Sequence, residues 1–255
     1  MGMSYKLYKG DCLEVMQRIE SGSVDAVIAD PPYGTTACKW DSVIPLEEMW
    51  EQLKRVIKPN GAIVMTASQP FTSALIMSNI EMFKYCWYWN KVLPRGHLNA
   101  KKMPLRAIEE IAVFYSKPPT YNPQKTQGHK RKVARTIYSK AGNGEQVYGK
   151  ETRDTFYDST ERYPTGILEI STANQLGKVH PTQKPVALMS YLIRTYTNPN
   201  DTILDFAMGS GSTGVACIQE NRNFIGIELL QEYVNIAEER IEQEIKRMRQ
   251  LEMFD

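Results

Sequence analysis

The stretch Thr202-Ile-Leu-Asp-Phe-Ala-Met-Gly-Ser-Gly-Ser-Thr-Gly214 passes from a short apolar run through two glycines into a second apolar run. Residues 202–205 predict a buried strand, and residues 213–220 predict a helix. Gly209 and Gly211 let the backbone turn tightly and approach a ligand closely. The helix that follows offers N–H groups and a positive dipole end to a carboxylate or phosphate. The stretch therefore predicts a ligand-binding strand–turn–helix unit.

The same alternation continues on both sides of this unit. Apolar patterns and turn residues predict strands at 5–10, 25–29, 62–67, 83–92, 108–115 and 224–227, and helices at 13–19, 46–57, 71–80, 185–196 and 231–251. The triplet Pro59-Asn60-Gly61 is predicted to separate a helix from the next strand. Alternating strands and helices predict an α/β fold with a doubly wound, mostly parallel sheet. Ligands bind at the carboxyl ends of such strands, where we expect Asp11, Asp30 and Glu228.

An acid after the next strand supports a nucleoside cofactor. Glu228 lies 19 residues after Gly209, and an acid at that position can accept hydrogen bonds from both ribose hydroxyls. Ser212 and Thr213 can cap the helix and contact the ligand. The spacing Gly-x-Gly-x-x-Gly is also used by dinucleotide enzymes, so a nicotinamide cofactor stays open at this point.

The motif Asp30-Pro31-Pro32-Tyr33 ends the strand at 25–29 and predicts the chemistry. An amine on a purine or pyrimidine ring is a poor nucleophile because its lone pair is delocalised. The Asp30 carboxylate and the Pro31 carbonyl can accept hydrogen bonds from its N–H groups and so direct the lone pair towards a methyl donor. The prolines hold these acceptors rigid, and the Tyr33 ring can stack on an extruded base.

Charge is distributed unevenly along the chain. Residues 82–144 contain 13 Lys or Arg and two acids, Glu109 and Glu110, which leaves 18 basic and 27 acidic residues elsewhere. The asymmetry predicts that this segment faces nucleic acid. Trp87 and Trp89 share a strand face within it, so we expect them to pack in the core or at an interface. The expected nucleic-acid contacts are Lys101, Lys102, Arg106, Lys130, Arg131, Lys132 and Arg135.

Composition excludes several other classes. The 42% apolar and 24% charged content is ordinary for a globular protein, and no apolar run is long enough for a membrane span. The first residues lack a signal core. Cys12, Cys38, Cys86 and Cys217 are scattered and form no C-x-x-C pair, so reduced thiols in the cytoplasm are expected rather than a metal or disulfide framework.

In its motifs and their order, the chain resembles the DNA amino methyltransferases that modify adenine N6 or cytosine N4. Asp30-Pro31-Pro32-Tyr33 precedes the glycine motif, as in the permuted beta class, and the resemblance extends from Gly10-Asp11-Cys12 to Glu228. It implies a permuted Rossmann-like methyltransferase fold, S-adenosylmethionine as cofactor and double-stranded DNA as substrate. It leaves open a homodimer and a restriction endonuclease partner.

The resemblance also implies roles for individual residues. Residues 1–116 would form the catalytic half, with Asp30 to Tyr33 catalytic, and residues 179–255 the cofactor half of the same domain. Residues 117–178, where loops and short elements are expected, would be an inserted target recognition region. Asp11 would contact the adenine end of the cofactor and Lys184 the methionine carboxylate. The other implied cofactor contacts are Cys12, Asp30, His180, Asp205, Phe206, Ala207, Gly209, Ser210, Gly211, Ser212, Thr213 and Glu228.

One position departs from the family pattern, and several alternatives stay open. The family usually has Asp-Pro-Phe where this chain has Asp205-Phe206-Ala207, which points to a reorganised cofactor wall. An Asp before Pro-Pro-Tyr favours adenine N6 over cytosine N4. Weaker alternatives are an RNA or protein-glutamine methyltransferase, a catalytically silent nucleic-acid-binding module and a dinucleotide oxidoreductase, which would leave Asp30-Pro31-Pro32-Tyr33 unexplained.

Overall fold

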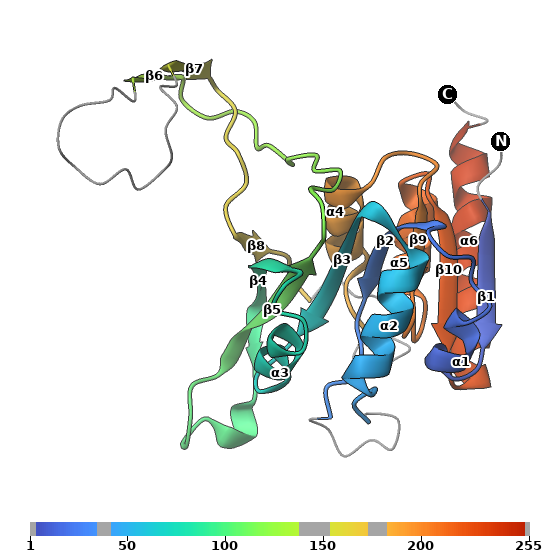
Figure 1. The fold of residues 1–255 in the computed structure, drawn as a ribbon. Coiled ribbons are helices and arrows are strands. Elements are labelled where there is room, and N and C mark those ends of the chain that lie inside the picture. The colour runs from blue at the N-terminus through green and yellow to red at the C-terminus, as the bar shows by residue number, and fades with distance from the viewer. Residues whose placement is uncertain (1–3, 35–41, 138–153, 173–182, 253–255) are drawn as a thin grey trace. The chain divides into compact units, whose positions relative to one another are not determined.

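A computed structural model describes residues 4–34, 42–137, 154–172 and 183–252 (Figure 1). The chain forms two compact units. The larger comprises Met1–Asn122 and Gly166–Asp255, and the smaller comprises Pro123–Thr165.

The larger unit is built on an eight-stranded sheet. Only β5 runs against the other strands, because every neighbouring pair is parallel except β3–β5 and β5–β4. The doubly wound, mostly parallel sheet predicted from the sequence is thus confirmed. The strand order is β1 (Tyr5–Lys9), β10 (Asn223–Glu228), β9 (Thr202–Asp205), β2 (Val24–Ala29), β3 (Ile57–Ala67), β5 (Arg106–Phe114), β4 (Phe83–Arg95) and β8 (Ile167–Glu169).

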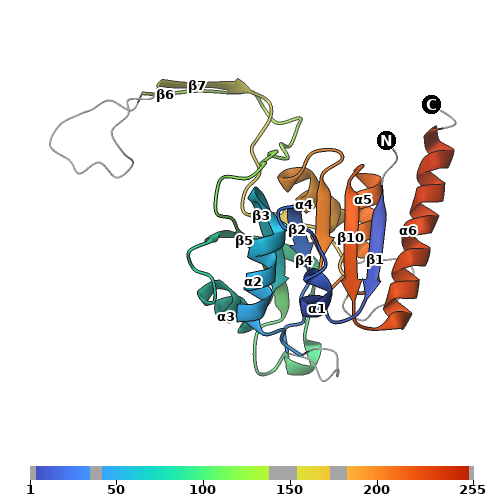
Figure 2. The same cartoon turned by 45° about the vertical axis from the view of Figure 1, so that its right-hand side comes forward.

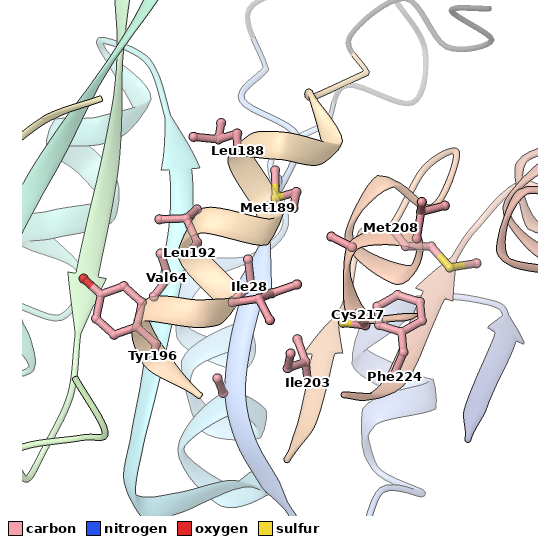
Figure 3. Packing of buried hydrophobic residues seen from close by; sticks show 14 of the residues in the cluster. Ile28, Val64, Leu188, Met189, Leu192, Tyr196, Ile203, Met208, Cys217 and Phe224 are labelled. Atoms are coloured by element: carbon pink, nitrogen blue, oxygen red, sulfur yellow. The ribbon is translucent and has the colours of Figure 1, made fainter. Parts of the chain in front are cut away.

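Helices cover both faces of this sheet (Figures 1 and 2). One face carries α1 (Cys12–Met16), α2 (Leu46–Val56) and α3 (Phe71–Met77), and the other carries α4 (Val186–Tyr196), α5 (Ser212–Gln219) and α6 (Gln231–Glu252). Alternate residues of β2 supply the two cores, because successive side chains of a strand point to opposite faces. Ile28 packs in the cluster below α4 and α5 (Figure 3), whereas Val27 packs with α1 and α2.

The prediction that Trp87 and Trp89 lie in the core is confirmed. Trp87 and Trp89 are 4% and 2% exposed and belong to the core cluster. On α6, Val234, Ala237 and Ile241 are buried at helical spacing, so one face of this helix packs on the sheet.

The predicted break at Pro59-Asn60-Gly61 is wrong, because β3 begins directly after α2 and includes these residues. The pairing with β2 explains how they are accommodated. Val24 pairs with Ile57 and Ala26 with Ala62, so β3 carries extra residues opposite β2. A bulge of this kind tolerates a proline and a glycine within a strand.

The smaller unit contains a two-stranded antiparallel sheet of β6 (Lys132–Ile137) and β7 (Asp154–Ser159). A further bridge joins Thr126 to Arg162. The neighbouring strand β8 lies within the stretch expected to be an insertion, but it pairs with β4 in the main sheet. A three-residue strand is too short to leave a periodic pattern. Among the described helices, none combines the length and apolarity that a membrane span requires.

Candidate active site

Asp30 and Asp205 lie at the carboxyl ends of the neighbouring strands β2 and β9, from which the chain continues towards opposite edges of the sheet. β2 leads through α2 to β3 on one side, and β9 leads through α5 to β10 on the other. Val27 of β2 pairs with Leu204 of β9, so the two strands end side by side. Open α/β sheets bind ligands at such a switch point.

A cavity of about 790 Å³ opens at this point of the larger unit. It lies within the size range of small-molecule sites. Its lining brings together the predicted catalytic turn and most of the predicted cofactor contacts, namely Asp11, Cys12, Asp30, Pro31, Pro32, Tyr33, Lys184, Asp205, Phe206, Ala207, Gly209, Ser210, Ser212, Thr213 and Glu228. Gly211 is not among the described lining residues, and His180 lies outside the residues that the structure describes.

Glu228 ties the glycine turn to the end of β10. Its Oε2 accepts a hydrogen bond of 3.0 Å from the Gly209 N–H, and its Oε1 accepts one of 2.9 Å from the Leu230 N–H. Burial raises the pKa of this carboxyl, although the backbone hydrogen bonds counteract the effect. Each oxygen keeps a second lone pair, so the carboxylate can also accept two hydroxyl groups.

The glycine turn offers a further polar group to a ligand. The Oγ of Ser212 is buried, lines the cavity and has no hydrogen-bond partner among the described residues. Buried polar atoms without a partner are rare in native proteins. A bound cofactor at this turn would supply the missing partner, so the residues present fit a nucleoside ligand.

Gly211 supports this turn through packing rather than through the cavity. It is the N-cap residue of α5 with a φ of 78°, in the left-handed region. A Cβ at this position would lie 2.7 Å from the Cβ of Ala237 in α6. Glycine is therefore required both by the backbone angle and by the close approach of the two helices.

Asp11 and Cys12 also line the cavity. The Asp11 Oδ1 accepts a hydrogen bond of 2.8 Å from the Leu13 N–H and caps α1. Burial, together with the charge of Asp11, raises the pKa of the Cys12 thiol to about 12. Cys12 is therefore a neutral side chain at physiological pH rather than a thiolate nucleophile.

Asp205 is the most deeply buried carboxylate of the site, at 2% exposure. Burial raises its pKa to about 7, while hydrogen bonds from Thr213 and from the Ala207 N–H act against this rise. Phe206, the residue that departs from the family pattern, is also buried and packs in the core on the α1–α3 face. The smaller Ala207 faces the cavity beside it.

The Asp30 carboxylate is held by donors on one oxygen. Its Oδ1 accepts hydrogen bonds from the Tyr33 hydroxyl at 2.6 Å and the Thr66 hydroxyl at 2.5 Å. The Lys184 Nζ lies 3.0 Å from the same oxygen. Oδ2 is therefore the oxygen that can accept a hydrogen bond from a substrate. The Tyr33 ring stacks on Phe71 with centroids 5.4 Å apart, which fixes its plane.

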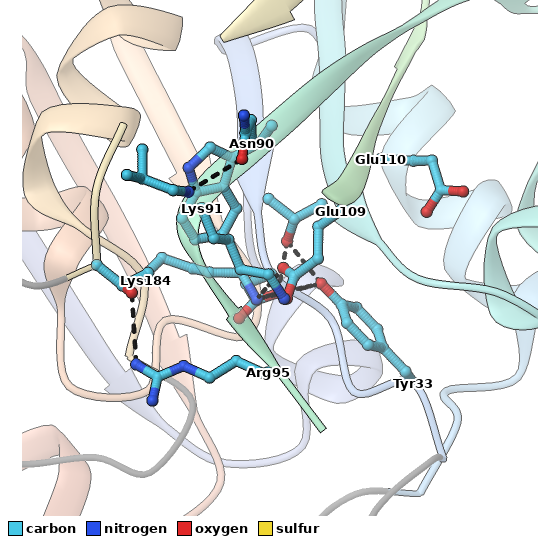
Figure 4. A network of polar contacts seen from close by, with 12 residues as sticks. Tyr33, Asn90, Lys91, Arg95, Glu109, Glu110 and Lys184 are labelled. Atoms are coloured by element: carbon cyan, nitrogen blue, oxygen red, sulfur yellow. Dashed lines mark hydrogen bonds and ion pairs between the residues drawn. The ribbon is translucent and has the colours of Figure 1, made fainter. Parts of the chain in front are cut away.

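Lys184 forms ion pairs with two carboxylates, of which Glu109 is labelled in Figure 4. Besides Asp30, its Nζ lies 3.2 Å from Glu109 Oε2, and Lys91 binds Glu109 Oε1 at 2.9 Å. Lys184 also donates to the Tyr33 hydroxyl at 3.3 Å. The implied contact of Lys184 with the methionine carboxylate stays a prediction, and the observed contacts favour a role beside the catalytic turn.

The charges of this network set its protonation states. Burial lowers the pKa of Lys184, but Asp30, Tyr33 and Glu109 more than compensate and raise it well above its usual value. Burial raises the pKa of Glu109, but Lys184 and Lys91 outweigh it and lower the pKa. Burial and the Asp30 charge raise the pKa of Tyr33 well above its usual value. Lys184 is thus a cation, Glu109 an anion and Tyr33 a neutral donor.

Two arginines on neighbouring strands contribute to the lining of the cavity. Arg95 on β4 pairs directly with Arg106 on β5, and both line the cavity. Like charges opposite each other in an antiparallel pair are destabilising, so an anion bound here would relieve repulsion. Lys101 and Lys102 are exposed in the connection between these strands.

The remaining predicted nucleic-acid contacts belong to the smaller unit. Lys130 and Lys132 are exposed. Arg131, by contrast, pairs with Asp158 through two hydrogen bonds of 2.7 and 2.6 Å. Arg135 lies on β6.

Several polar residues of the site were not predicted from the sequence, among them Thr66, Lys91, Arg95 and Glu109. A signal for Glu109 was present, because it is one of only two acids in the basic segment 82–144. Thr66 and Lys91 stand near the ends of predicted strands, where ligand-binding residues are expected. Their partners, however, lie far away in the sequence.

The family of the chain follows from comparison with known proteins. A model of the N6/N4 methyltransferase family, described as DNA methylase, matches residues 24–239, which include the catalytic turn and the glycine turn. The chain belongs to this family of DNA methylases.

Relatives match nearly the whole methylase. The type II methyltransferase M1.MboII of Moraxella bovis is 26% identical over 253 residues, covering 91% of this chain and 94% of its own. The type II methyltransferase M.HpaI of Haemophilus parainfluenzae is 26% identical over 259 residues, covering 95% of this chain and 76% of its own.

Solved structures share the fold. The crystal structure of the M1.HpyAVI–SAM complex superimposes with a TM-score of 0.63 at 27% identity, covering 93% of this chain and 98% of that one. The cytosine-N4-specific PvuII DNA methyltransferase superimposes with a TM-score of 0.65 at 18% identity, covering 97% and 93%. The predicted methyltransferase fold is thereby confirmed.

Proposed function

We propose that this methylase transfers a methyl group from S-adenosylmethionine to the exocyclic N6 of adenine in double-stranded DNA. One observation carries the proposal: a single cavity joins the Asp30 carboxylate to the glycine turn and Glu228. A nucleoside cofactor and a flipped base would therefore meet in one enclosed space. The similarity to the M1.HpyAVI–SAM complex supports the choice of cofactor.

Residues of the cofactor half would hold S-adenosylmethionine along the ends of β1, β9 and β10. Glu228 would accept the ribose hydroxyls, Asp11 would lie towards the adenine, and Ser212 would gain the partner that its buried hydroxyl lacks. When bound, the cofactor supplies an electrophilic methyl group on a positively charged sulfur.

The catalytic turn prepares the amine that receives this methyl group. Asp30 Oδ2 and the Pro31 carbonyl accept hydrogen bonds from the two N–H groups of the amine, so its lone pair points towards the methyl donor. Because Tyr33, Thr66 and Lys184 hold Oδ1, the carboxylate does not need to reorient during the reaction. As the N–C bond forms, the bond between the methyl group and sulfur breaks and its electron pair stays on sulfur. Asp30 would accept the proton that the nitrogen releases.

Adenine is favoured over cytosine by the first residue of the turn. By resemblance within the family, a serine at the first position of this turn would indicate a cytosine N4 methyltransferase. This chain has Asp30 at that position. Base flipping would bring either base to the same turn, so the assignment concerns the target atom and not the architecture.

Duplex DNA as the substrate is supported by the basic segment. Arg95 and Arg106 stand opposite each other beside the cavity, where a phosphate would relieve their repulsion. We propose that Pro123–Thr165, the smaller unit, forms the core of the target recognition region. A homodimer and a restriction endonuclease partner stay predictions.

Analysis of the modified base tests the proposal. The methylase is incubated with duplex DNA and S-adenosylmethionine labelled on the methyl group, and the DNA is digested to nucleosides. Labelled N6-methyl-2′-deoxyadenosine is expected. Labelled N4-methyl-2′-deoxycytidine would replace the proposed target, and absence of label from DNA would refute the function. The Asp30→Ala variant serves as the inactive control.

A further inference from the structure

The ion pairs behind the catalytic turn form an alternating chain of charges. Asp30, Lys184, Glu109 and Lys91 follow one another with separations of 3.0, 3.2 and 2.9 Å. The side chains of Lys184 and Lys91 are each 9% exposed, and that of Glu109 is 17% exposed. Two cations thus balance two carboxylates in a largely buried cluster.

Fold stability alone does not account for this arrangement. A buried ion pair costs desolvation energy that its Coulomb attraction often fails to recover, and apolar residues of similar volume frequently stabilise as well or better. The four residues also line the cavity of the active site. A functional role explains why charges are kept there.

The backbone next to Lys91 is strained. Val92 has a φ of 65°, which is an outlier for a β-branched residue. Asn90 Oδ1 accepts a hydrogen bond of 3.0 Å from the Val92 N–H and stabilises this turn. The pairing of β4 with β5 shifts register between Asn90 and Arg95. Bulges and strained residues of this kind cluster at functional sites, where they redirect a side chain.

We propose that Glu109 is a positioning residue for methyl transfer, which shares the Lys184 ammonium with Asp30 and is itself held by Lys91. The inference rests on the proposed function. Without Glu109, the full charge of Lys184 would fall on Asp30 and weaken this carboxylate as an acceptor for the target amine. Lys184 would also stand unbalanced beside the nitrogen, which gains positive charge as the N–C bond forms.

The Glu109→Gln variant tests the proposal because it keeps the shape and removes the charge. Single-turnover rates are measured with saturating DNA and S-adenosylmethionine, beside KM for DNA and calorimetric cofactor affinity. We expect the rate to fall roughly 10- to 50-fold, the effect of one charge several ångströms away at an effective dielectric constant of about 20. KM for DNA and cofactor affinity should change less than about threefold, given a contact made with neither ligand.

Two further variants separate positioning from structural support. Glu110→Gln is the matched control, because Glu110 is adjacent on β5 and contacts Thr72 and Gln69 instead of the lysines; its rate should stay at the wild-type level. Glu109→Asp keeps the charge and should recover most of the rate. All rates are compared below the melting temperature of each variant.

Two results for the Glu109 variants would overturn the inference. A wild-type rate for Glu109→Gln would show that the charge is not used, and an equally slow Glu109→Asp would show that the shape of the side chain matters instead. Wild-type protein that modifies cytosine would change the proposed target and leave the role of Glu109 open to the same test. Wild-type protein that modifies no base would refute the proposed function itself.

Discussion

Glu228 Oε2 accepts a hydrogen bond of 3.0 Å from the backbone N–H of Gly209, across the turn that separates β9 from α5. The same carboxylate is thus expected to shape the turn and to hold the ribose of the cofactor. Its position at the end of β10 beside β9 makes both contacts compatible.

Replacing Glu228 should weaken cofactor binding. Glu228→Ala removes an acceptor for the ribose hydroxyls and releases Gly209, and we expect a loss of about 1–3 kcal/mol in binding free energy for a charged acceptor. Titration calorimetry with S-adenosylmethionine measures it. Glu228→Gln, which keeps one acceptor oxygen, should lose less; equal affinity of the wild type and Glu228→Ala would contradict the assignment.

Asp30 and Tyr33 should act on the target base. Asp30→Ala should abolish turnover while the fold persists. Tyr33→Ala should mainly weaken capture of the extruded base, since base stacking contributes about 1–3 kcal/mol in single-strand binders. Fluorescence of 2-aminopurine at the target position follows extrusion. Tyr33→Phe keeps the ring and loses the hydrogen bond to Asp30, so normal extrusion with slower transfer is expected.

Two outcomes would contradict the assignment of Asp30 and Tyr33 to the target base. Asp30→Ala protein that methylates DNA at the normal rate would exclude Asp30 from catalysis. Loss of 2-aminopurine fluorescence in Tyr33→Phe as severe as in Tyr33→Ala would mean that the hydroxyl, and not the ring, secures the base.

Burial of Asp205 should make stability depend on pH. Because its pKa is raised from 3.8 to about 7, its contribution to folding is fully present below about pH 4 and is lost as the pH rises to about 7. Asp205→Asn removes this titration. As the pH rises through this window, the free energy of unfolding of the variant should therefore increase relative to that of the wild type by up to about 1.4 kcal/mol per pH unit.

Denaturant unfolding at a series of pH values, without added cofactor, measures this difference. Above about pH 7 the difference should level off, because Asp205 is then ionised in both the folded and unfolded states. A difference that stays constant from about pH 4 to about pH 8 would show that Asp205 does not titrate as its burial implies.

Lys130 and Lys132 should supply sequence-independent affinity for DNA. Both are exposed, and removal of one phosphate-binding charge should reduce the log–log salt slope by roughly 0.9 on duplex DNA. Lys130→Ala/Lys132→Ala should thus flatten the salt dependence on cognate and scrambled duplexes alike. Arg131→Ala should change the slope less, because Asp158 already pairs with Arg131.

Fluorescence anisotropy at several salt concentrations provides the measurement. An unchanged slope for the double variant would place these lysines away from DNA. A loss confined to the cognate duplex would assign them to base recognition instead.

Local signals predicted the parts of the site that are continuous in sequence. Asp30-Pro31-Pro32-Tyr33 and the turn at Gly209 each follow a short buried strand, and prolines or glycines mark where those strands end. The contacts of Glu109 could not be predicted in this way. They depend on the pairing of β4 with β5 and on the distant Lys184, and no periodic pattern encodes which charges meet across a sheet.

The strand β8 at the edge of the main sheet could not be predicted from a local pattern either. β8 is found through its pairing with β4 and has no recognisable pattern of its own. The bulge at Pro59-Asn60-Gly61 likewise depends on how β3 meets β2. Turn residues predict a break, and only the neighbouring strand decides whether the chain leaves the sheet.

The residues that flank the smaller unit on both sides are hydrogen-bonded within the larger unit. Before it, the backbone N–H of Asn122 donates to the Thr195 carbonyl at 2.7 Å, and the Asn122 side chain donates to the Arg194 and Thr197 carbonyls. After it, β8 is secured by β4. The segment between these two anchors can therefore be exchanged or lengthened during evolution without disturbing the sheet that carries the catalytic turn. Under the proposed assignment of the smaller unit to target recognition, a methylase built in this way can acquire a new target sequence by exchanging one continuous segment.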